Sequence, residues 1–177
     1  MKHLYLIIIV AALLSGCTQK QTTTEANASV KFITIDGQDL IQPDGSKLFI
    51  KGTNLGNWLN PEGYMFKLTR TGSARFINEM FCQLVGPDFT AEFWKAFKDN
   101  YITREDIRFI KETGSNTIRL PFHYKLFTDE DYMGLTANQD GFARIDSVVK
   151  WCREEGLYLI LDMHDAPGGQ SGDNIDD

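Results

Sequence analysis

The sequence predicts a parallel α/β fold of the (β/α)8 barrel type. Short apolar runs alternate with amphipathic helical stretches, and the runs at 116–122 and 157–163 are rich in apolar residues. Strands of this kind are buried on both faces, as in parallel sheets that helices cover. Turns from a helix into a strand are abrupt, whereas the connections after a strand are long and polar. That asymmetry is typical of a barrel, whose functional loops follow the carboxyl ends of its strands.

A doubly wound sheet is the alternative to the barrel. It would need a tight glycine-rich turn after the first strand that leads straight into a helix. Here Gly52 leads instead into a long insertion at 59–100. The sequence therefore favours the barrel, of which we expect only the N-terminal hairpin and roughly the first three strands in these 177 residues.

The hairpin comes first along the chain. Two turn signals, Asp36-Gly37 and Pro43-Asp44-Gly45, separate short apolar runs within residues 30–56. Asp-Gly between such runs predicts a β-hairpin, and its last arm continues into residues 51–54.

Helices and strands then alternate. Apolar spacing predicts helices at 73–84 and 90–100. Thr103 is a predicted N-cap with Asp106 three residues later, and Gly114 ends that helix. The remaining predicted elements are a strand at 116–122, a helix at 140–155 that ends at Gly156, and a strand at 157–163.

The N-terminus has the pattern of an export signal. Lys2 gives a positive start, and residues 4–14 are apolar but too short to span a bilayer of about 30 Å. Leu-Ser-Gly-Cys, ending at Cys17, resembles the bacterial lipobox, although an ordinary signal peptide with a chance cysteine is the alternative. We expect a signal peptide at 1–16, then a lipidated cysteine and flexible tether at 17–29. The protein would be an exported bacterial lipoprotein, anchored at the cell surface or the periplasmic face.

Composition excludes some partners. The net charge is −6, and loss of the signal peptide makes it more negative because only Lys2 is charged there. An acidic surface argues against nucleic acid and anionic lipid as partners. Of three cysteines, Cys17 is assigned to lipid, and we expect Cys82 and Cys152 to be buried free thiols. No cysteine or histidine spacing indicates a zinc site, and no cofactor is predicted.

Polar and aromatic side chains follow the carboxyl ends of the predicted strands. The first strand delivers Asn54 and Trp58, and the second delivers Arg119 and His123. The third delivers Asp162, His164 and Asp165. Hydrogen-bonding groups beside an aromatic ring suit a sugar, which offers hydroxyls at its edges and C–H groups on its faces. The sequence therefore predicts a carbohydrate site at this rim.

Three segments carry a resemblance to a known family. KGTNLGNWLNPEGYMF, GSNTIRLPFHY and LYLILDMHDAPGGQSG resemble the first three strand-end motifs of glycoside hydrolase family 5, the cellulase-type retaining (β/α)8 glycosidases. The His-x-Ala-Pro-Gly-x-Gln-x-Gly pattern is similar to the branch that contains exo-β-1,3-glucanases. The resemblance covers residues 30–177, as the N-terminal part of a barrel. Asp165 replaces the usual glycine of that branch, and the insertion at 59–100 is long, so the glucan linkage stays open.

The resemblance implies roles for the rim residues. Arg119 matches an arginine that hydrogen-bonds the nucleophilic carboxylate and keeps it ionised, with a structural ion pair as the alternative. His164 matches a histidine that contacts the sugar, and Asp162 either supports it or serves only the barrel. Further substrate contacts are expected from Asn54, Trp58, His123 and Asp165. For the first two of these, a turn residue and a core aromatic are the alternatives.

The catalytic glutamates of the family are expected outside this chain. The resemblance implies that they follow strands four and seven, beyond Asp177, so these residues alone would be inactive. No Asn-Glu pair follows His164, and Asn78-Glu79 lies in a predicted helix. The full-length protein is expected to be a retaining glycosidase (EC 3.2.1.-) of β-linked glucan or a related polysaccharide.

Two other functions are alternatives to this one. A metal-dependent barrel hydrolase could use Asp162, His164 and Asp165 as ligands, but it would want a His-x-His at the first strand tip. Gly52-Thr53-Asn54 supplies none. A non-catalytic glycan-binding lipoprotein of the cell surface would keep Trp58 but would have no reason for Arg119.

Overall fold

The computed structural model describes residues 32–134 and 140–168. The predicted signal peptide, Cys17 and the tether lie outside the described residues. Backbone contacts divide the chain into two compact units, Met1–Leu48 and Phe49–Asp177. Within the described ranges, no helix has both the length and the apolar character that crossing a membrane requires.

The first unit contains the predicted hairpin. Strand β1 (Thr34–Asp36) pairs antiparallel with strand β2 (Asp39–Ile41). Gly37 has a φ of +60°, which a glycine adopts without steric cost and which the tight turn requires. After β2 the chain folds back beside this strand, where the backbone N–H of Leu48 donates to the carbonyl of Leu40 over 2.7 Å.

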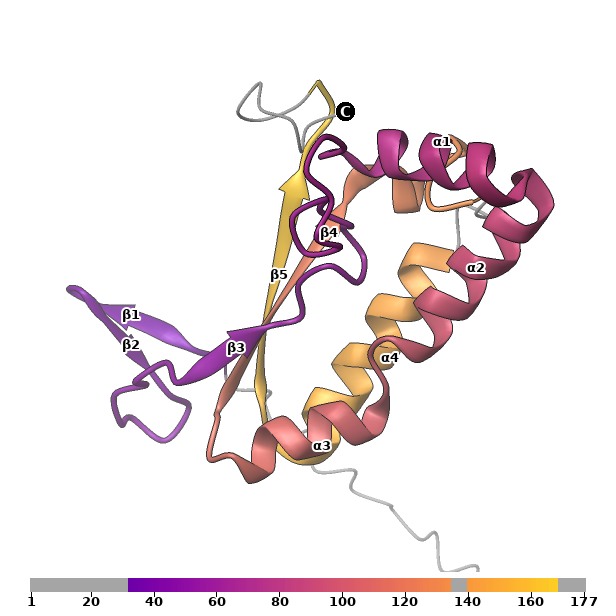
Figure 1. The fold of residues 1–177 in the computed structure, drawn as a ribbon. Helices are drawn as coiled ribbons and strands as arrows, with labels where there is room; N and C mark the ends of the chain where they lie inside the picture. Colours follow the sequence, from indigo (N-terminus) through magenta and orange to yellow (C-terminus); the bar gives the residue numbers. More distant parts are fainter. Residues whose placement is uncertain (1–31, 135–139, 169–177) are drawn as a thin grey trace, which may run out of the picture. The chain divides into compact units, whose positions relative to one another are not determined.

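The second unit is built on a three-stranded parallel sheet in the order β3-β4-β5 (Figure 1). The strands are β3 (Gly52–Asn54), β4 (Thr117–His123) and β5 (Tyr158–Asp165). Asn54 lies opposite Arg119, and Arg119 lies opposite Ile160. The predicted parallel arrangement is confirmed, and it brings the carboxyl ends of the strands to one edge.

Helices connect the strands close to the predicted positions. They are α1 (Ala74–Val85), α2 (Pro87–Asn100), α3 (Arg104–Glu112), the 3-10 helix η1 (Tyr124–Phe127) and α4 (Asp140–Glu155). Helix α2 begins three residues before the predicted start, because Pro87 suits the first helical turn. At the start of α3, the Asp106 carboxylate accepts from the backbone N–H (2.7 Å) and hydroxyl (2.8 Å) of Thr103. The predicted helix start is therefore confirmed.

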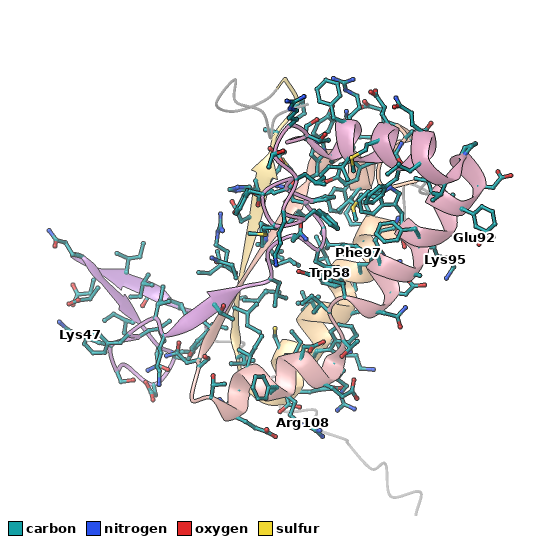
Figure 2. The ribbon with its side chains drawn as sticks, in the orientation of Figure 1. Lys47, Trp58, Glu92, Lys95, Phe97 and Arg108 are labelled. Atoms are coloured by element: carbon teal, nitrogen blue, oxygen red, sulfur yellow. The ribbon has the colours of Figure 1, made fainter. Side chains whose placement is uncertain are left out.

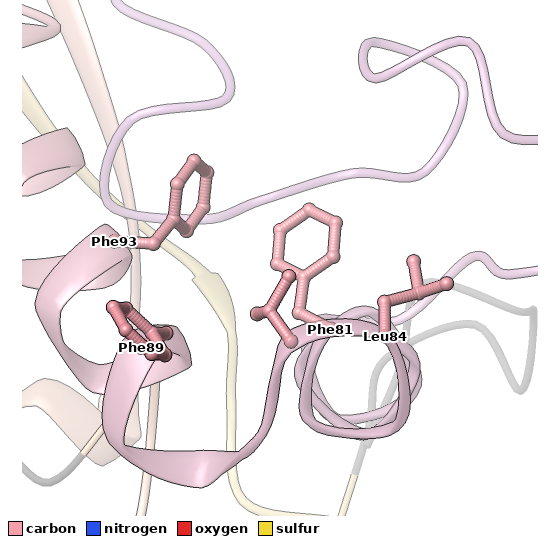
Figure 3. A pocket seen from close by; sticks show the side chains of 5 residues that line it. Phe81, Leu84, Phe89 and Phe93 are labelled. Carbon is pink, nitrogen blue, oxygen red and sulfur yellow. The ribbon is translucent and has the colours of Figure 1, made fainter.

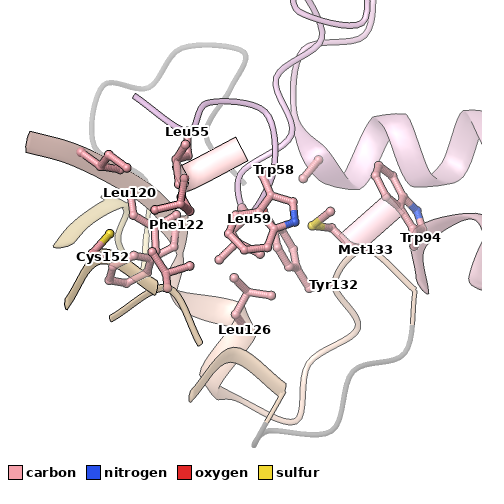
Figure 4. Close-up of a cluster of buried hydrophobic side chains, with 14 of the residues drawn as sticks. Leu55, Trp58, Leu59, Trp94, Leu120, Phe122, Leu126, Tyr132, Met133 and Cys152 are labelled. Atoms are coloured by element: carbon pink, nitrogen blue, oxygen red, sulfur yellow. The ribbon is translucent and has the colours of Figure 1, made fainter. Parts of the chain in front are cut away.

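The core lies between the sheet and the helices. Alternate side chains of β4, Ile118, Leu120 and Phe122, are buried in one apolar cluster with Ile107 of α3 and Val148 of α4. Figure 4 shows part of this cluster, with Leu120 and Phe122 labelled. Each fully buried side chain of this size stabilises the fold by about 1.5–3 kcal/mol. Since successive strand residues point to opposite faces, this packing turns the remaining β4 side chains away from the helices.

An aromatic cluster joins α1 to α2. Trp94 of α2 is fully buried, and its indole N–H donates to the side-chain oxygen of Asn78 in α1 over 2.9 Å. Asn78-Glu79 thus lies within a helix, as predicted. The rings that surround Trp94 at centroid distances of 5.1–6.2 Å are Phe66, Phe81, Phe93 and Phe97.

A buried charge joins α2 to α4. Lys98 is 4% exposed, and its ammonium lies 3.3 Å from the carboxylate of Asp140. Burial lowers the pKa of Lys98, and the nearby Asp140 only partly opposes that shift. Arg144 also contacts this carboxylate, at 3.1 Å. The carboxylate therefore has two cationic partners.

Both cysteines of the described residues are free thiols, as predicted. Cys152 of α4 is buried, and burial raises its pKa to about 11. Cys82 of α1 is only half-buried, so the prediction that it is buried was too strong.

Candidate active site

Three polar side chains meet at the carboxyl end of the sheet. Arg119 of β4 and Asp162 of β5 form an ion pair through Nη2 and Oδ2. The Nδ1 atom of His164 lies 3.0 Å from this oxygen and 3.1 Å from this guanidinium nitrogen. The three side chains are 34%, 26% and 31% exposed, respectively. The cluster is therefore ordered by mutual contacts but still open to a ligand.

The strand register explains why these three side chains meet. Arg119 lies opposite Ile160, so Asp162 and His164, two and four residues further along β5, share the face of Arg119. The opposite face of β4 is occupied by the apolar core. The shared face predicted for Asp162 and His164 is therefore confirmed by their contact.

Arg119 has a carboxylate partner within the chain. Among the described residues that partner is Asp162, so the structural ion pair considered as an alternative does form. Part of the guanidinium remains exposed and can reach a further anion. Contact with a catalytic nucleophile stays a prediction.

Asn54 is placed beside this cluster. It ends β3, lies opposite Arg119 in register and has an exposed side chain. The register places it on the same face of the sheet. Its role as a sugar contact stays a prediction.

Trp58 does not lie on the open rim, and this corrects the expectation of a sugar platform. It is 2% exposed and is turned toward α2 (Figure 2). Its indole N–H donates to the backbone carbonyl of Lys98 over 2.9 Å. The ring is buried with its one polar group satisfied, so Trp58 is the core aromatic of the alternative reading.

His123 and Asp165 are buried as well, at 1% and 2% exposed, and so do not offer the expected open substrate contacts. The His123 ring stacks on Tyr132 at 4.4 Å between centroids, and its Nδ1 accepts the backbone N–H of Lys125 over 3.1 Å. A β-bulge after Phe122 pairs His123 with Asp165, so regular alternation stops at this point. The bulge was not foreseen from the sequence.

A buried polar segment follows β3 and was not among the predicted site residues. Asn57, Asn60 and Glu62 are all buried, although they lie in a loop. Asn57 has a φ of +63°, and its side-chain oxygen accepts the backbone N–H of Glu62 over 3.0 Å. The signal available in the sequence was the density of asparagine and acid directly after a strand. These groups shape the loop beside the rim.

An apolar pocket of about 670 Å³ lies elsewhere, between α1 and α2 (Figure 3). Its lining residues are Phe81, Leu84, Val85, Phe89 and Phe93. None of them offers a hydrogen bond or a charge, and none follows a sheet strand. It is therefore not the candidate site.

The metal ligand set of the alternative function does not form. In residues 32–134 and 140–168, no three histidine, cysteine, aspartate or glutamate side chains are grouped so as to hold a metal ion. Asp162 and His164 meet, but Asp165 is buried beyond the bulge.

Known proteins resemble this chain over its larger part. A β-xylosidase of Phanerodontia chrysosporium is 33% identical over 80% of this chain, which corresponds to 29% of the relative. A glucan 1,3-β-glucosidase of Kluyveromyces lactis is 31% identical over 70% of this chain and 30% of its own length. The chain therefore spans about 30% of the length of these two curated relatives.

The structural comparison supports the fold. The crystal structure of a rutinosidase from Aspergillus niger matches 70% of this chain and 35% of that chain, with a TM-score of 0.53 and 22% identity. The likeness agrees with the parallel sheet and its covering helices, which form part of a (β/α)8 barrel. The family model "Cellulase (glycosyl hydrolase family 5)" matches residues 78–177, more than half of the sequence and the part that contains β4 and β5. On this match, the chain belongs to glycosyl hydrolase family 5, the cellulase family.

Proposed function

We propose that the whole protein is a retaining glycoside hydrolase that acts on a β-linked glucan or a related polysaccharide. The observation that carries the proposal is the Arg119–Asp162–His164 cluster at the carboxyl edge of the sheet, in a chain of this family. The name of one relative, a glucan 1,3-β-glucosidase, supports a β-glucan as substrate.

The reaction needs two carboxylates about 5–5.5 Å apart, one as nucleophile and one as acid/base. In this proposal both glutamates belong to later barrel strands that these 177 residues do not include. Arg119 would hold the nucleophile ionised and oriented, because a guanidinium can donate two parallel hydrogen bonds to a carboxylate. His164 would hold a hydroxyl of the sugar that is cleaved.

The proposal includes the place where the enzyme works. The lipobox-like segment that ends at Cys17 would anchor the protein to the membrane through lipid, at the cell surface or the periplasmic face. A polysaccharide is too large to enter a cell readily, so an enzyme that cleaves it benefits from export.

Hydrolysis by the whole protein and by two Arg119 variants tests the proposal. Arg119→Ala should lose on the order of two to three powers of ten in kcat for an aryl β-glucoside and for laminarin. Arg119→Lys should also lose activity, because it keeps the charge but not the bidentate geometry. His164→Ala should fall by less, since it holds substrate and not the nucleophile.

Arg108→Ala is the matched control, because Arg108 is an exposed arginine of α3 that forms an ion pair with Glu112 of the same helix. It should keep wild-type activity. Near wild-type rates for folded Arg119→Ala would contradict the proposed site. Binding of glucan without hydrolysis would favour the glycan-binding lipoprotein instead. Parallel assays on β-1,3-, β-1,4- and β-1,6-glucans then identify the linkage.

A further inference from the structure

The contact between Asp162 and His164 bears on which ring nitrogen of His164 carries the proton, as well as on the position of the ring. A single ring nitrogen, Nδ1, lies within 3.1 Å of both the Asp162 carboxylate and the Arg119 guanidinium. We propose that Asp162 is a positioning residue that keeps the proton of His164 on Nδ1, so that Nε2 is the hydrogen-bond acceptor offered to a substrate hydroxyl. The substrate part of this inference rests on the proposed function.

The donor and acceptor chemistry of the three groups supports this assignment. A guanidinium can only donate hydrogen bonds, and an ionised carboxylate can only accept them. If Nδ1 carries the proton, it donates to Asp162, whose Oδ2 also accepts from Arg119. All contacts to the carboxylate are then charge-assisted hydrogen bonds, which are about twice as strong as neutral ones.

The opposite tautomer is less favourable. If Nδ1 carries no proton, it can accept from Arg119, but its lone pair then faces the Asp162 oxygen at 3.0 Å with no hydrogen between them. That arrangement places a lone pair against an anion. The carboxylate therefore selects the tautomer with the proton on Nδ1 in the neutral ring. The charged ring carries a proton on both nitrogens and keeps the same Nδ1–H contact.

The choice of tautomer affects which groups of His164 and Arg119 are left to bind a ligand. A neutral imidazole protonated on Nδ1 has an acceptor at Nε2, and the structure gives Nε2 no hydrogen-bond partner among the described residues. The His164 ring is about a third exposed, so a sugar hydroxyl can reach that nitrogen. The same carboxylate oxygen holds Nη2 of Arg119, and within residues 32–134 and 140–168 no hydrogen bond engages the other guanidinium N–H groups, which can therefore reach an anion.

Nitrogen NMR of the whole protein with ¹⁵N-labelled histidine tests the assignment directly. His123 is an internal reference for the opposite tautomer, because its Nδ1 accepts the Lys125 N–H and so carries no proton. In the wild type at neutral ring charge, His164 should show a protonated Nδ1 and an unprotonated Nε2. A His164→Gln variant assigns the signals.

Substitution of Asp162 should move the proton. In Asp162→Ala, Nδ1 should accept from Arg119, so the proton should shift to Nε2 while the His123 signals stay unchanged. Asp162→Asn is the shape-conserving variant, and its amide oxygen should retain the wild-type tautomer. Asp99→Asn is the control, since Asp99 also pairs with an arginine, Arg144, at 2.7 Å but away from the sheet edge.

Activity gives the second readout. By analogy with carboxylates that orient histidines in metal sites, Asp162→Ala should lose roughly 10- to 100-fold in kcat/KM, with Asp162→Asn between it and wild type and the control unchanged. An unchanged His164 tautomer in folded Asp162→Ala would overturn the inference. A tautomer that moves as expected in a protein that cleaves no glycan would support the positioning role and refute only the proposed function.

Discussion

Replacement of Trp58 by phenylalanine separates a core role from a sugar-binding role. The indole is 2% exposed, and its N–H donates to the Lys98 carbonyl over 2.9 Å. Phenylalanine keeps an aromatic ring at this position but removes the donor and part of the volume. We therefore expect a loss of stability without a loss of substrate affinity.

The size of the loss follows from these contacts. Arg144 Nη1 also donates to the Lys98 carbonyl, at 2.8 Å, so removing the indole N–H does not leave that oxygen without a hydrogen bond. The hydrogen bond should therefore cost only its net value of about 1 kcal/mol. The side chain shrinks by about 40 Å³, and at roughly 24 cal/mol per Å³ the cavity adds about 1 kcal/mol. The variant should lose about 2–3 kcal/mol in free energy of unfolding once lost apolar burial is included.

Urea unfolding and steady-state kinetics of the whole protein provide the measurement. The urea midpoint of Trp58→Phe should fall, and its KM for laminarin should remain within about twofold of wild type, a change too small to reflect a lost stacking contact. Trp151→Phe is the control, because it makes the same change in side-chain size at a half-buried tryptophan of α4. It should lose less stability. An unchanged midpoint together with a several-fold higher KM would place Trp58 on the rim and refute the reasoning.

Three further predictions concern titration, reactivity and anchoring. Burial puts the pKa of Lys98 below its unfolded value of 10.5, so the unfolded state binds more protons and stability should rise as pH rises toward 10.5. Lys98→Met should make the free energy of unfolding depend less on pH in urea unfolding series from pH 7 to 10. It should not lower stability greatly, because Asp140 keeps Arg144 as a cationic partner. An unchanged pH dependence would contradict this prediction. Burial raises the pKa of Cys152 to about 11, so iodoacetamide at pH 8 should modify the half-buried Cys82 first, as peptide mass spectrometry can show; equal rates would refute the ordering. Cys17→Ser should release the protein from the membrane fraction, and unchanged membrane association would contradict lipidation.

Local patterns were enough to predict the hairpin, the α-helices and the strands of the parallel sheet, but not the 3-10 helix η1. The capping residues Thr103 and Asp106 and the helical apolar spacing depend on neighbours within a few residues, so their consequences can be read directly from the chain. The same applies to the Asp36-Gly37 turn of the hairpin, where a positive φ requires glycine. Boundaries shifted by only a few residues, as in α2.

Only some of the predicted rim residues lie together in the structure, and there is a physical cause for which of them do. Arg119, Asp162 and His164 were expected at one rim because they lie near the carboxyl ends of parallel strands. Asp162 and His164 were expected on one face because residues of a regular strand alternate with period two. His123 and Asp165 lie at the bulge, where the alternation stops. A bulge depends on how two strands pair, and neither strand alone contains that information.

The sequence by itself determined the order of strands and helices, the parallel sheet and the face shared by Asp162 and His164. Each of these follows from periodicity and from turn chemistry within short segments. Only the tertiary structure decided that Trp58 belongs to the core and that Arg119 pairs with Asp162. Burial and pairing depend on which distant side chains fill the neighbouring space: the partner of Trp58 lies 40 residues away along the chain, and that of Arg119 lies on the next strand.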